Sequence, residues 1–319
     1  MDYDALRWPD ALAPVRREIA DRLNTDLGRI GGDAYRRSNA TLLLSIATKE
    51  FLPILKLWLK QAKRLKGVDT LVVGCDEQTR AVLQRSRVRS VAAHIPDSPA
   101  EGQYRSATGF DARGLLSTAL KFPAVLHALS HYEMVVLCDL DGLPMKEPTP
   151  FVDARADIAF QREWYYPKVF VNAWGLAACT GFVCFRNTEQ GVAFTKTARA
   201  LNEEFYSDQL AFNLAIERSK PDWHWPDNPT LPIGDQRVFA AAAAQDIFAT
   251  AGALRLQALR VDRFYRHNWV PIDVPKVAFY HPNTKKDVSR KVQILTSFTR
   301  RYWASRLLGT LAGRGNRGT

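Results

Sequence analysis

The chain has 319 residues, of which 46% are hydrophobic, 24% charged and 11% aromatic, a composition typical of soluble globular proteins. No stretch approaches the roughly 18–20 consecutive apolar residues that span a bilayer. The formal net charge is +11, yet residues 285–319 alone hold nine Lys or Arg and one Asp. A nucleic-acid enzyme usually spreads its basic side chains along a binding face, so this distribution argues against nucleic acid as a partner.

Hydrophobic periodicity predicts helices and strands that alternate along most of the chain. An amphipathic helix over 11–28 precedes a first strand at 41–47, whose nearly continuous apolar run suits a strand covered on both faces. The elements that follow are helix 50–65, strand 70–74, helix 77–87, strand 90–95, loop 96–109, helix 112–130, strand 134–138, strands 157–161 and 181–185, helices 189–204 and 207–218, and strand 277–280. This alternation predicts an α/β fold, a three-layer sandwich with a mostly parallel central sheet.

The C-terminal segment differs from the rest of the chain in charge and pattern. It interleaves Lys and Arg with apolar and aromatic side chains, which suits an interfacial helix on an anionic membrane surface. The alternative is a helix that packs on the preceding domain and is followed by a disordered end. We therefore divide the chain into an N-terminal helical extension, 1–39, an α/β domain, 40–285, and a basic amphipathic tail, 286–319.

The cysteines indicate a reducing compartment. Cys75, Cys138, Cys179 and Cys184 lie in or beside predicted buried strands, and no pair has the CxxC spacing of a zinc or redox site. We expect reduced thiols in a cytoplasmic protein, peripheral on the inner face of the membrane if the tail binds there. The first residues, Met1–Asp4, also lack the basic and apolar blocks of a signal peptide.

Polar residues follow several predicted strands at one edge of the sheet. Parallel strands bring their carboxyl ends to the same rim, and open α/β sheets bind ligands outside that rim. Thr48 follows the first strand, Asp76 closely follows the second, and Asp139 and Asp141 follow strand 134–138. The sequence therefore predicts a binding site at this rim, although packing or turn roles fit Thr48 and Asp76 equally well.

Asp139 and Asp141 form the most informative pair. Side chains two residues apart in an extended segment point the same way, so the two carboxylates converge. Their repulsion would raise one pKa unless a cation lay between them. A hard divalent ion, Mn²⁺ or Mg²⁺, accepts oxygen ligands and leaves positions open for phosphate oxygens. The spacing alone also fits a strand-ending turn with an Asx cap.

Four ordered segments resemble one enzyme family. The first runs from Leu120-Lys121 through 134–141 to Glu147-Pro148, and the others are 179–187, 207–213 and 279–282. Together they resemble the nucleotide-diphospho-sugar transferase family of GT-A fold glycosyltransferases, and more distantly the glycogenin-like and galactosyltransferase enzymes. The resemblance covers residues 40–285 and implies a GT-A (Rossmann-like) catalytic domain with a DxD motif at Asp139–Asp141.

The resemblance implies a metal site next to a diphosphate site. Asp139 would contact the metal and the ribose, Asp141 would ligate the metal, and His281 would be the C-terminal ligand. Without the family, a histidine after an apolar strand reads as a structural cap. Lys285 or Lys286 would reach the diphosphate. The glycogenin-like pattern has its lysine six residues after the histidine, whereas these lysines follow His281 at four and five.

Five further residues are implied to contact the donor. Lys121 would neutralise donor charge, and Thr180 and Gly181 would lie beside the donor, where a residue without Cβ permits close approach. Asp208 and Gln209 would line the sugar pocket near the anomeric carbon and act in catalysis. The simpler interpretations are a solvated helix lysine for Lys121 and a helix N-cap for Ser207 or Asp208.

These features predict a metal-dependent hexosyl- or pentosyltransferase. It would move a sugar from a nucleotide-diphosphate donor, with UDP favoured, to a saccharide, lipid-linked or protein acceptor, as in polysaccharide biosynthesis. Thr48 and Asp76 would contact the ribose or base, and the resemblance favours retention of configuration. One alternative is a sugar-nucleotide pyrophosphorylase, but the turn 47–50 lacks the glycine of its phosphate loop. Another is a non-catalytic carbohydrate-binding protein on the same fold.

Two aromatic-rich loops are candidates for acceptor binding. They are Trp223-His224-Trp225 and the segment 264–269. Aromatic rings in loops stack on sugars, but they also pack beneath their own loops. Both interpretations stay open for these residues.

Overall fold

The computed structural model describes residues 3–29, 39–93, 95, 112–225, 239–240, 242–267, 270–283 and 287–315; the predicted loop 96–109 lies outside them. Its α-helices are α1 (Ala13–Arg29), α2 (Leu52–Ala62), α3 (Glu77–Arg85), α4 (Ala112–Thr118), α5 (Lys121–Leu129), α6 (Lys168–Trp174), α7 (Glu189–Glu204), α8 (Asp208–Ser219) and α10 (Val288–Gly315). Its strands are β1 (Thr41–Ala47), β2 (Val68–Gly74), β3 (Arg89–Ala92), β4 (Met134–Cys138), β5 (Leu143–Pro144), β6 (Ile158–Glu163), β7 (Ala177–Arg186), β8 (Asp222–His224), β9 (Ile247–Ala251), β10 (Leu254–Leu259), β11 (Phe264–Tyr265) and β12 (Phe279–Tyr280).

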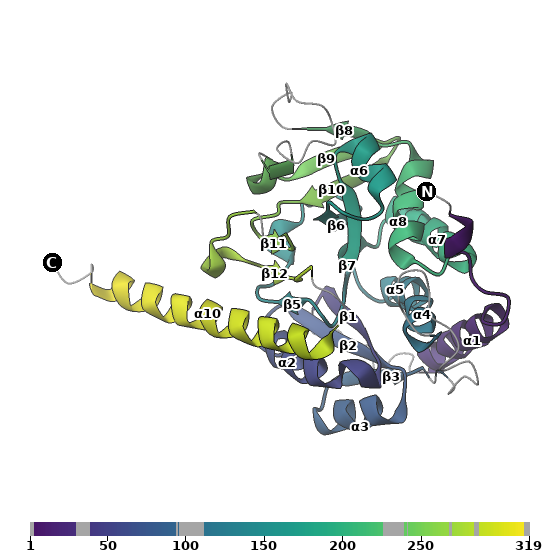
Figure 1. Ribbon diagram of the computed structural model, residues 1–319, viewed down its shortest axis with the longest axis horizontal. Helices are drawn as coiled ribbons and strands as arrows, with labels where there is room; N and C mark the ends of the chain where they lie inside the picture. The colour runs from purple at the N-terminus through teal and green to yellow at the C-terminus, as the bar shows by residue number, and fades with distance from the viewer. Residues whose placement is uncertain are drawn as a thin grey trace.

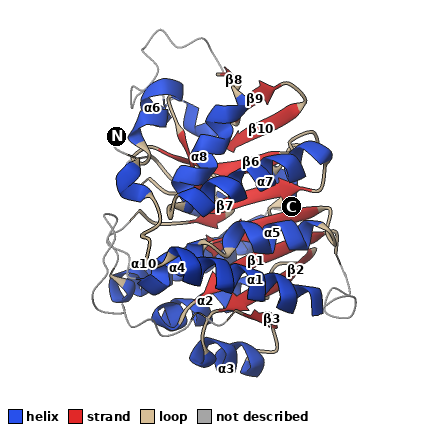
Figure 2. Ribbon diagram, turned by 90° about the vertical axis from the view of Figure 1, so that its right-hand side faces the viewer, coloured by secondary structure: helices blue, strands red, loops and turns tan. Residues whose placement is uncertain are grey.

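A nine-stranded sheet runs through the molecule in the order β3-β2-β1-β4-β7-β6-β10-β9-β8 (Figures 1 and 2). Strands β3, β2, β1 and β4 pair in parallel, as do β6 and β10. Strand β7 runs antiparallel to both β4 and β6, and β9 runs antiparallel to both β10 and β8. Among the described strands of this sheet, only β7 and β9 therefore oppose the common direction.

Helices cover the sheet on both faces. Figure 1 shows α1, α5, α7 and α8 on one side of the strands, with α2 and α10 on the other. Strand β1 contacts both α5 and α2, and Leu42, Leu43 and Leu44 are fully buried in it. Burial on both faces explains the nearly continuous apolar run at 41–47. The predicted three-layer α/β sandwich with a mostly parallel central sheet is confirmed.

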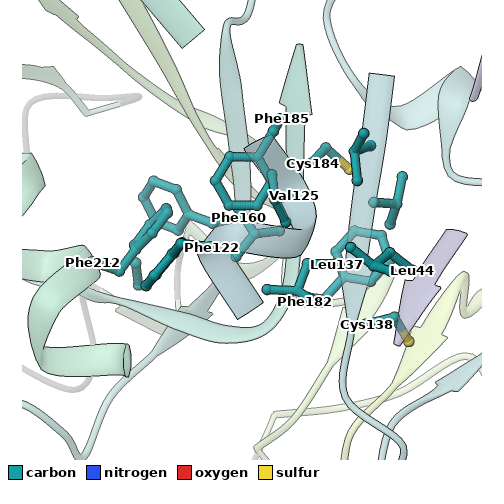
Figure 3. Packing of buried hydrophobic residues seen from close by; sticks show 14 of the residues in the cluster. Leu44, Phe122, Val125, Leu137, Cys138, Phe160, Phe182, Cys184, Phe185 and Phe212 are labelled. Atoms are coloured by element: carbon teal, nitrogen blue, oxygen red, sulfur yellow. The ribbon is translucent and has the colours of Figure 1, made fainter. Parts of the chain in front are cut away.

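An aromatic cluster joins α5, α8 and the sheet (Figure 3). The ring of Phe122 in α5 stacks with Phe212 in α8 at a centroid distance of 6.4 Å, and Phe185 of β7 and Phe160 of β6 pack edge-on against Phe212. Such buried ring pairs contribute about 0.5–1.5 kcal/mol each beyond their area. Because Lys121 immediately precedes Phe122 and α8 begins at Asp208, the cluster also sets where these two charged residues lie.

A second, three-stranded sheet holds β12 between β11 and β5. Strands β11 and β12 are parallel, so Arg266 and His281 follow them side by side, and the His281 amide donates to the Tyr265 carbonyl at 2.9 Å. Strand β5 pairs antiparallel with β12 and begins two residues after Asp141. This small sheet therefore brings Asp141, Arg266 and His281 to one place.

Helix α10 packs along the α/β body at its N-terminal end and extends away from it toward the C-terminus (Figure 1). Leu295, Phe298 and Tyr302 are buried, and the Phe298 ring stacks on Tyr280 of β12 at 3.8 Å between centroids. These three side chains belong to the apolar set that was predicted to face a membrane. They contact the protein instead, which agrees with the alternative of a helix that packs on the preceding domain. These contacts cross the predicted boundary at 285/286, and the three-part division of the chain stays a prediction.

Several element boundaries differ from the predictions. The expected helix 112–130 is two helices, because Pro123 in the first turn of α5 has no N–H to continue the ladder from α4. The predicted strands 90–95 and 277–280 are shorter, as β3 and β12, whereas 181–185 is part of the longer β7. The β9–β10 hairpin was not predicted, although Leu254, Leu256 and Ala258 alternate inward.

The remaining whole-chain expectations concern thiols and membranes. All four cysteines are free and buried, and burial raises the pKa of Cys179 to about 12, so this group is a neutral thiol. The four cysteines thus lie in the core, as expected, and their reduced state in the cell stays a prediction. Within the described ranges, none of the helices is both long enough and apolar enough to cross a bilayer.

Candidate active site

The two aspartates of the DxD motif leave β4 at the carboxyl rim of the sheet. The Asp139 amide donates to the Gly181 carbonyl of β7 at 2.9 Å, which extends the β4–β7 ladder to the motif. The Gly142 amide then donates to the Asp139 carbonyl at 3.0 Å and closes a turn. A Cβ on Gly142 would lie 2.1 Å from the Phe279 ring, so the turn needs glycine to pack against β12.

Asp139 lies in a buried network with a lysine and a second carboxylate. The Lys121 ammonium lies 2.6 Å from Asp139 Oδ1 and 2.7 Å from Asp208 Oδ2. The Thr180 hydroxyl donates to the same Asp208 oxygen at 2.7 Å. Ser207, one of the two residues predicted as a helix N-cap, accepts the Leu210 amide at the start of α8, which leaves the Asp208 carboxylate for this network. Lys121 is buried and not a solvated helix lysine.

The charge of Lys121 is well compensated in this network, whereas the charge of Asp139 is not. Burial alone would lower the pKa of Lys121, but Asp139 and Asp208 outweigh it and raise that pKa, so the lysine is a permanent cation. Burial raises the pKa of Asp139, and the neighbouring Asp141 and Asp208 add to the rise against the opposing effect of Lys121. Asp139 thus has less compensating positive charge than its burial demands.

Asp141 has a different set of partners. His281 Nε2 lies 3.2 Å from Asp141 Oδ1, and the Lys291 ammonium of α10 donates to Asp141 Oδ2. Burial would raise the pKa of Asp141, but His281 and Lys291 together hold it well below its usual value. Asp141 is therefore ionised throughout the physiological pH range.

Asp139, Asp141 and His281 together could hold a metal ion. Each offers a ligand atom, two carboxylate oxygens and one imidazole nitrogen, and these atoms all lie within 4.8 Å of one another. A Cβ on Gly181 would lie 2.2 Å from His281 Cε1, so only glycine at this position lets the imidazole approach the aspartates. Two oxygens and one nitrogen with further positions open suit Mn²⁺ or Mg²⁺.

Buried polar side chains contact Nδ1, the His281 ring nitrogen that faces away from Asp141. Gln161 Oε1 lies 3.3 Å from His281 Nδ1, and Arg266 Nη1 lies 2.8 Å from the same nitrogen. Arg266 Nε donates to Glu163 Oε2 at 2.5 Å, and Glu163 Oε1 accepts the amides of Trp164 and Tyr165. Burial lowers the pKa of His281, with Arg266 as a further cause, so the ring is neutral near pH 7.

The other predicted site residues lie in varied places. Asp76 caps α3 through the Thr79 amide at 2.8 Å and accepts the Lys49 amide at 2.7 Å, which is the turn role. Thr48 is buried before a 3-10 turn and makes no capping bond. Gln209 donates to the Tyr166 carbonyl. Lys285 and Lys286 lie outside the described residues.

Sequence patterns missed four residues of this site: Gln161, Glu163, Arg266 and Lys291. Gln161 and Glu163 lie at the end of β6, at the same rim as Asp139. Their position at the end of an apolar strand could therefore have indicated site residues. Lys291 was assigned to the charge of the tail, and only the packing of α10 brings it to Asp141.

The predicted aromatic loops largely pack on the protein. Trp223 lies against Phe160 and Trp174, at centroid distances of 6.2 and 6.1 Å, and Phe264 is buried. Residues 268–269 lie outside the described part of the chain. A different aromatic residue, Tyr165 after β6, leaves 50% of its surface exposed at the carboxyl rim.

One family model and two solved glycosyltransferase structures are similar to this chain. No curated protein matches the sequence. The fold is similar to glycosyltransferase GlyE of Streptococcus pneumoniae TIGR4, at 11% identity and a TM-score of 0.42 over 87% of this chain and 64% of that one. It is also similar to mouse xyloside xylosyltransferase 1 in its apo form, at 12% identity and 0.43 over 77% of this chain and 99% of that one. The family model for nucleotide-diphospho-sugar transferases matches residues 68–295. The chain belongs to the nucleotide-diphospho-sugar transferase family.

Proposed function

We propose that this glycosyltransferase is metal-dependent and takes its sugar from a nucleotide-diphosphate donor, with UDP favoured. The observation that carries the proposal is the convergence of Asp139, Asp141 and His281 within 4.8 Å. These three residues come from two sheets, and a purely structural turn at the DxD motif would not need the histidine. The proposed ion is Mn²⁺ or Mg²⁺.

The charge of the site supports a cation. Among the contacts described above, four carboxylates (Asp139, Asp141, Asp208 and Glu163) meet three cationic side chains (Lys121, Lys291 and Arg266). One carboxylate therefore lacks a matching charge, and Asp139, whose pKa burial raises, is the least well compensated. A divalent ion would reverse this imbalance, and a diphosphate would balance the ion in turn.

The chemical difficulty in glycosyl transfer is the departure of the nucleoside diphosphate from the anomeric carbon. A bound divalent ion would supply Lewis acidity to the diphosphate oxygens. Lys291 lies against Asp141 and would add a second positive charge beside the leaving group. Lys285 and Lys286 remain proposed diphosphate contacts, and Thr48 and Asp76 remain proposed contacts of the ribose or base.

The sugar itself is proposed to lie near α8. Asp208 is held by Lys121 and Thr180, so its carboxylate is fixed beside Asp139. We assign Asp208 and Gln209 to the donor sugar, with Thr180 and Gly181 beside it and Lys121 as the fixed positive charge. Retention of the anomeric configuration is part of the proposal and rests on the family resemblance.

The acceptor is proposed to be a saccharide, a lipid-linked sugar or a protein. Tyr165 is the exposed aromatic ring at the rim and would stack on an acceptor sugar. The protein is proposed to be cytoplasmic and to bind peripherally to the anionic inner face of a membrane. Helix α10 supports this location because it exposes Arg290, Arg300, Arg301 and Arg306. Loss of binding to anionic vesicles on changing these arginines to glutamine would support that location, and unchanged flotation would refute it.

A screen of nucleotide sugars tests the donor. Each nucleotide sugar is incubated with the protein in Mn²⁺ or in EDTA, and donor hydrolysis and the shift in melting temperature are measured. We expect hydrolysis of at least one UDP-sugar, and stabilisation by UDP in Mn²⁺ but not in EDTA. Equal stabilisation by UDP in both buffers would contradict metal-dependent donor binding.

A further inference from the structure

Two of the three groups around His281 Nδ1 have opposite hydrogen-bonding chemistry, and the third, Cys179 Sγ at 3.7 Å, is a weak partner. Gln161 Oε1, at 3.3 Å, can only accept a hydrogen bond, whereas Arg266 Nη1, at 2.8 Å, can only donate one. A neutral imidazole carries one proton, so Nδ1 satisfies one of these partners at a time. Which partner it satisfies decides which nitrogen holds the proton, and therefore whether Nε2 has a free lone pair toward Asp141.

The orientation of the Gln161 amide is fixed by the backbone. Gln161 is fully buried in β6, and its Nε2 donates to the Phe264 carbonyl at 3.2 Å. A flipped amide would turn its oxygen toward that carbonyl and lose the bond. The pairing register of β6 and β7 shifts between Phe160 and Gln161, a bulge-like irregularity that directs Gln161 toward His281.

We propose that Gln161 is a positioning residue for the metal site. By accepting a hydrogen bond from Nδ1–H, it selects the tautomer of His281 whose Nε2 is unprotonated and points at Asp141. The inference rests on the proposed function, because it gives Gln161 a role only if His281 is a metal ligand. Metal-binding histidines generally donate their other ring N–H to such a partner, and loss of that partner costs about 10–100-fold in metal affinity.

Arg266 supplies the competing state. When it donates to Nδ1, the proton lies on Nε2, which then donates to Asp141 Oδ1 at 3.2 Å. Arg266 Nη1 also lies 3.2 Å from Nε2, so Arg266 must leave the imidazole before Nε2 can bind a metal ion. Arg266 can leave the imidazole without becoming an unpaired buried charge, because its Nε stays on Glu163 Oε2 at 2.5 Å. In the metal-free site, Nε2 therefore carries the proton and donates it to Asp141 in a hydrogen bond. When Nδ1 exchanges Arg266 for Gln161 as its partner, the proton moves to Nδ1 and the lone pair of Nε2 becomes available to a metal ion.

Three variants of the full chain test this role. Gln161→Met keeps the size of the side chain but replaces the amide oxygen with a thioether, which is only a weak hydrogen-bond acceptor. Gln161→Glu keeps an oxygen acceptor at the same reach. Gln257→Met is the matched control, since Gln257 is also buried and its amide also makes two hydrogen bonds, here to the Asp153 amide and the Phe151 carbonyl, away from the triad. The Kd for Mn²⁺ alone is measured by electron paramagnetic resonance, together with the nitrogen coupling of bound Mn²⁺ and the melting temperature.

We expect Gln161→Met to weaken Mn²⁺ binding by about 10–100-fold and to reduce the nitrogen coupling. Gln161→Glu should bind Mn²⁺ as tightly as the wild type or more tightly, and Gln257→Met should change only the melting temperature. Wild-type affinity and coupling in Gln161→Met would overturn the inference, and so would tenfold weaker binding in Gln161→Glu, even if Gln161→Met does not fold. A wild-type protein that binds no Mn²⁺ would instead overturn the proposed metal site itself.

Discussion

The two aspartates of one motif, only two residues apart, lie in two differently built halves of the site. Asp139 belongs with Lys121, Asp208 and Thr180, which come from α5, α8 and β7 around the aromatic cluster. Asp141 belongs with His281, which follows strand β12 of the small sheet, and with Lys291, which lies in α10. Burial and neighbouring carboxylates raise the pKa of Asp139, whereas His281 and Lys291 lower that of Asp141.

The difference separates a structural half from an adaptable half. Lys121 is shared by two carboxylates, so moving its ammonium would leave both Asp139 and Asp208 without a cation. Asp141 has two cationic or polar partners, one of them a lysine on the C-terminal helix, which a bound ion would replace. We therefore expect loss of a cation from the Asp139 half to cost more stability, and loss of a cation from the Asp141 half to be more readily offset by a bound metal ion.

Replacing the two lysines should separate the halves most strongly. Lys121→Met leaves Asp139 and Asp208 buried without their shared cation, and we expect a loss of about 3–5 kcal/mol in the free energy of unfolding. Lys291→Met should cost less, because Asp141 keeps His281. Urea unfolding with and without Mn²⁺ checks this: Mn²⁺ should restore the stability of Lys291→Met more than that of Lys121→Met. Equal losses in both variants would remove the distinction.

Gly181 is the point where the halves touch. In Gly181→Ala, the new Cβ would meet His281 Cε1 at 2.2 Å, so we expect a loss of about 1–3 kcal/mol in stability. Mn²⁺ binding should weaken as well, because the imidazole must move from the aspartates. Gly74→Ala is the control, since its Cβ would come no nearer than 3.2 Å to any atom. Titration calorimetry with Mn²⁺ that found both variants alike would show that His281 does not need the close approach.

A third effect, sensitivity to mild acid, should come from His267 beside Glu163, outside both halves. Burial lowers the pKa of His267, which lies 3.9 Å from Glu163, to about 4. Below pH 6.5 the unfolded chain binds a proton at His267 that the folded chain binds only near pH 4, so stability falls as the pH is lowered between these values. This one group should remove about 2 kcal/mol between pH 7 and pH 5. Urea unfolding of His267→Gln should show a correspondingly smaller drop, and an identical drop would contradict the assignment.

Much of the Asp139 half could be predicted from the sequence. The apolar strand before the motif places both aspartates at the rim, and the family resemblance adds Lys121, Thr180 and Asp208, which the structure brings into contact. These residues lie in or beside long, strongly patterned elements. Their positions follow from the packing of α5 and α8 on β7.

The Asp141 half was predicted only in part. His281 was expected from the resemblance, but β11 and β12 have two residues each and show no periodicity that could place Arg266 beside it. Lys291 depends on Phe298 packing against Tyr280, a contact between elements that hydrophobic patterns in α10 do not specify. Short strands and helix docking are decided by tertiary contacts, which local sequence does not encode.

Binding of UDP in the presence of Mn²⁺ tests the central claim, that the two halves form one metal-dependent donor site. Isothermal titration would compare the wild type, Asp141→Asn and the control Asp153→Asn, whose carboxylate pairs with Arg155 before β6, at the opposite edge of the sheet. We expect Mn²⁺-dependent UDP binding in the wild type and the control, and none in Asp141→Asn with its fold intact. Unchanged metal-dependent UDP binding in Asp141→Asn would contradict the account.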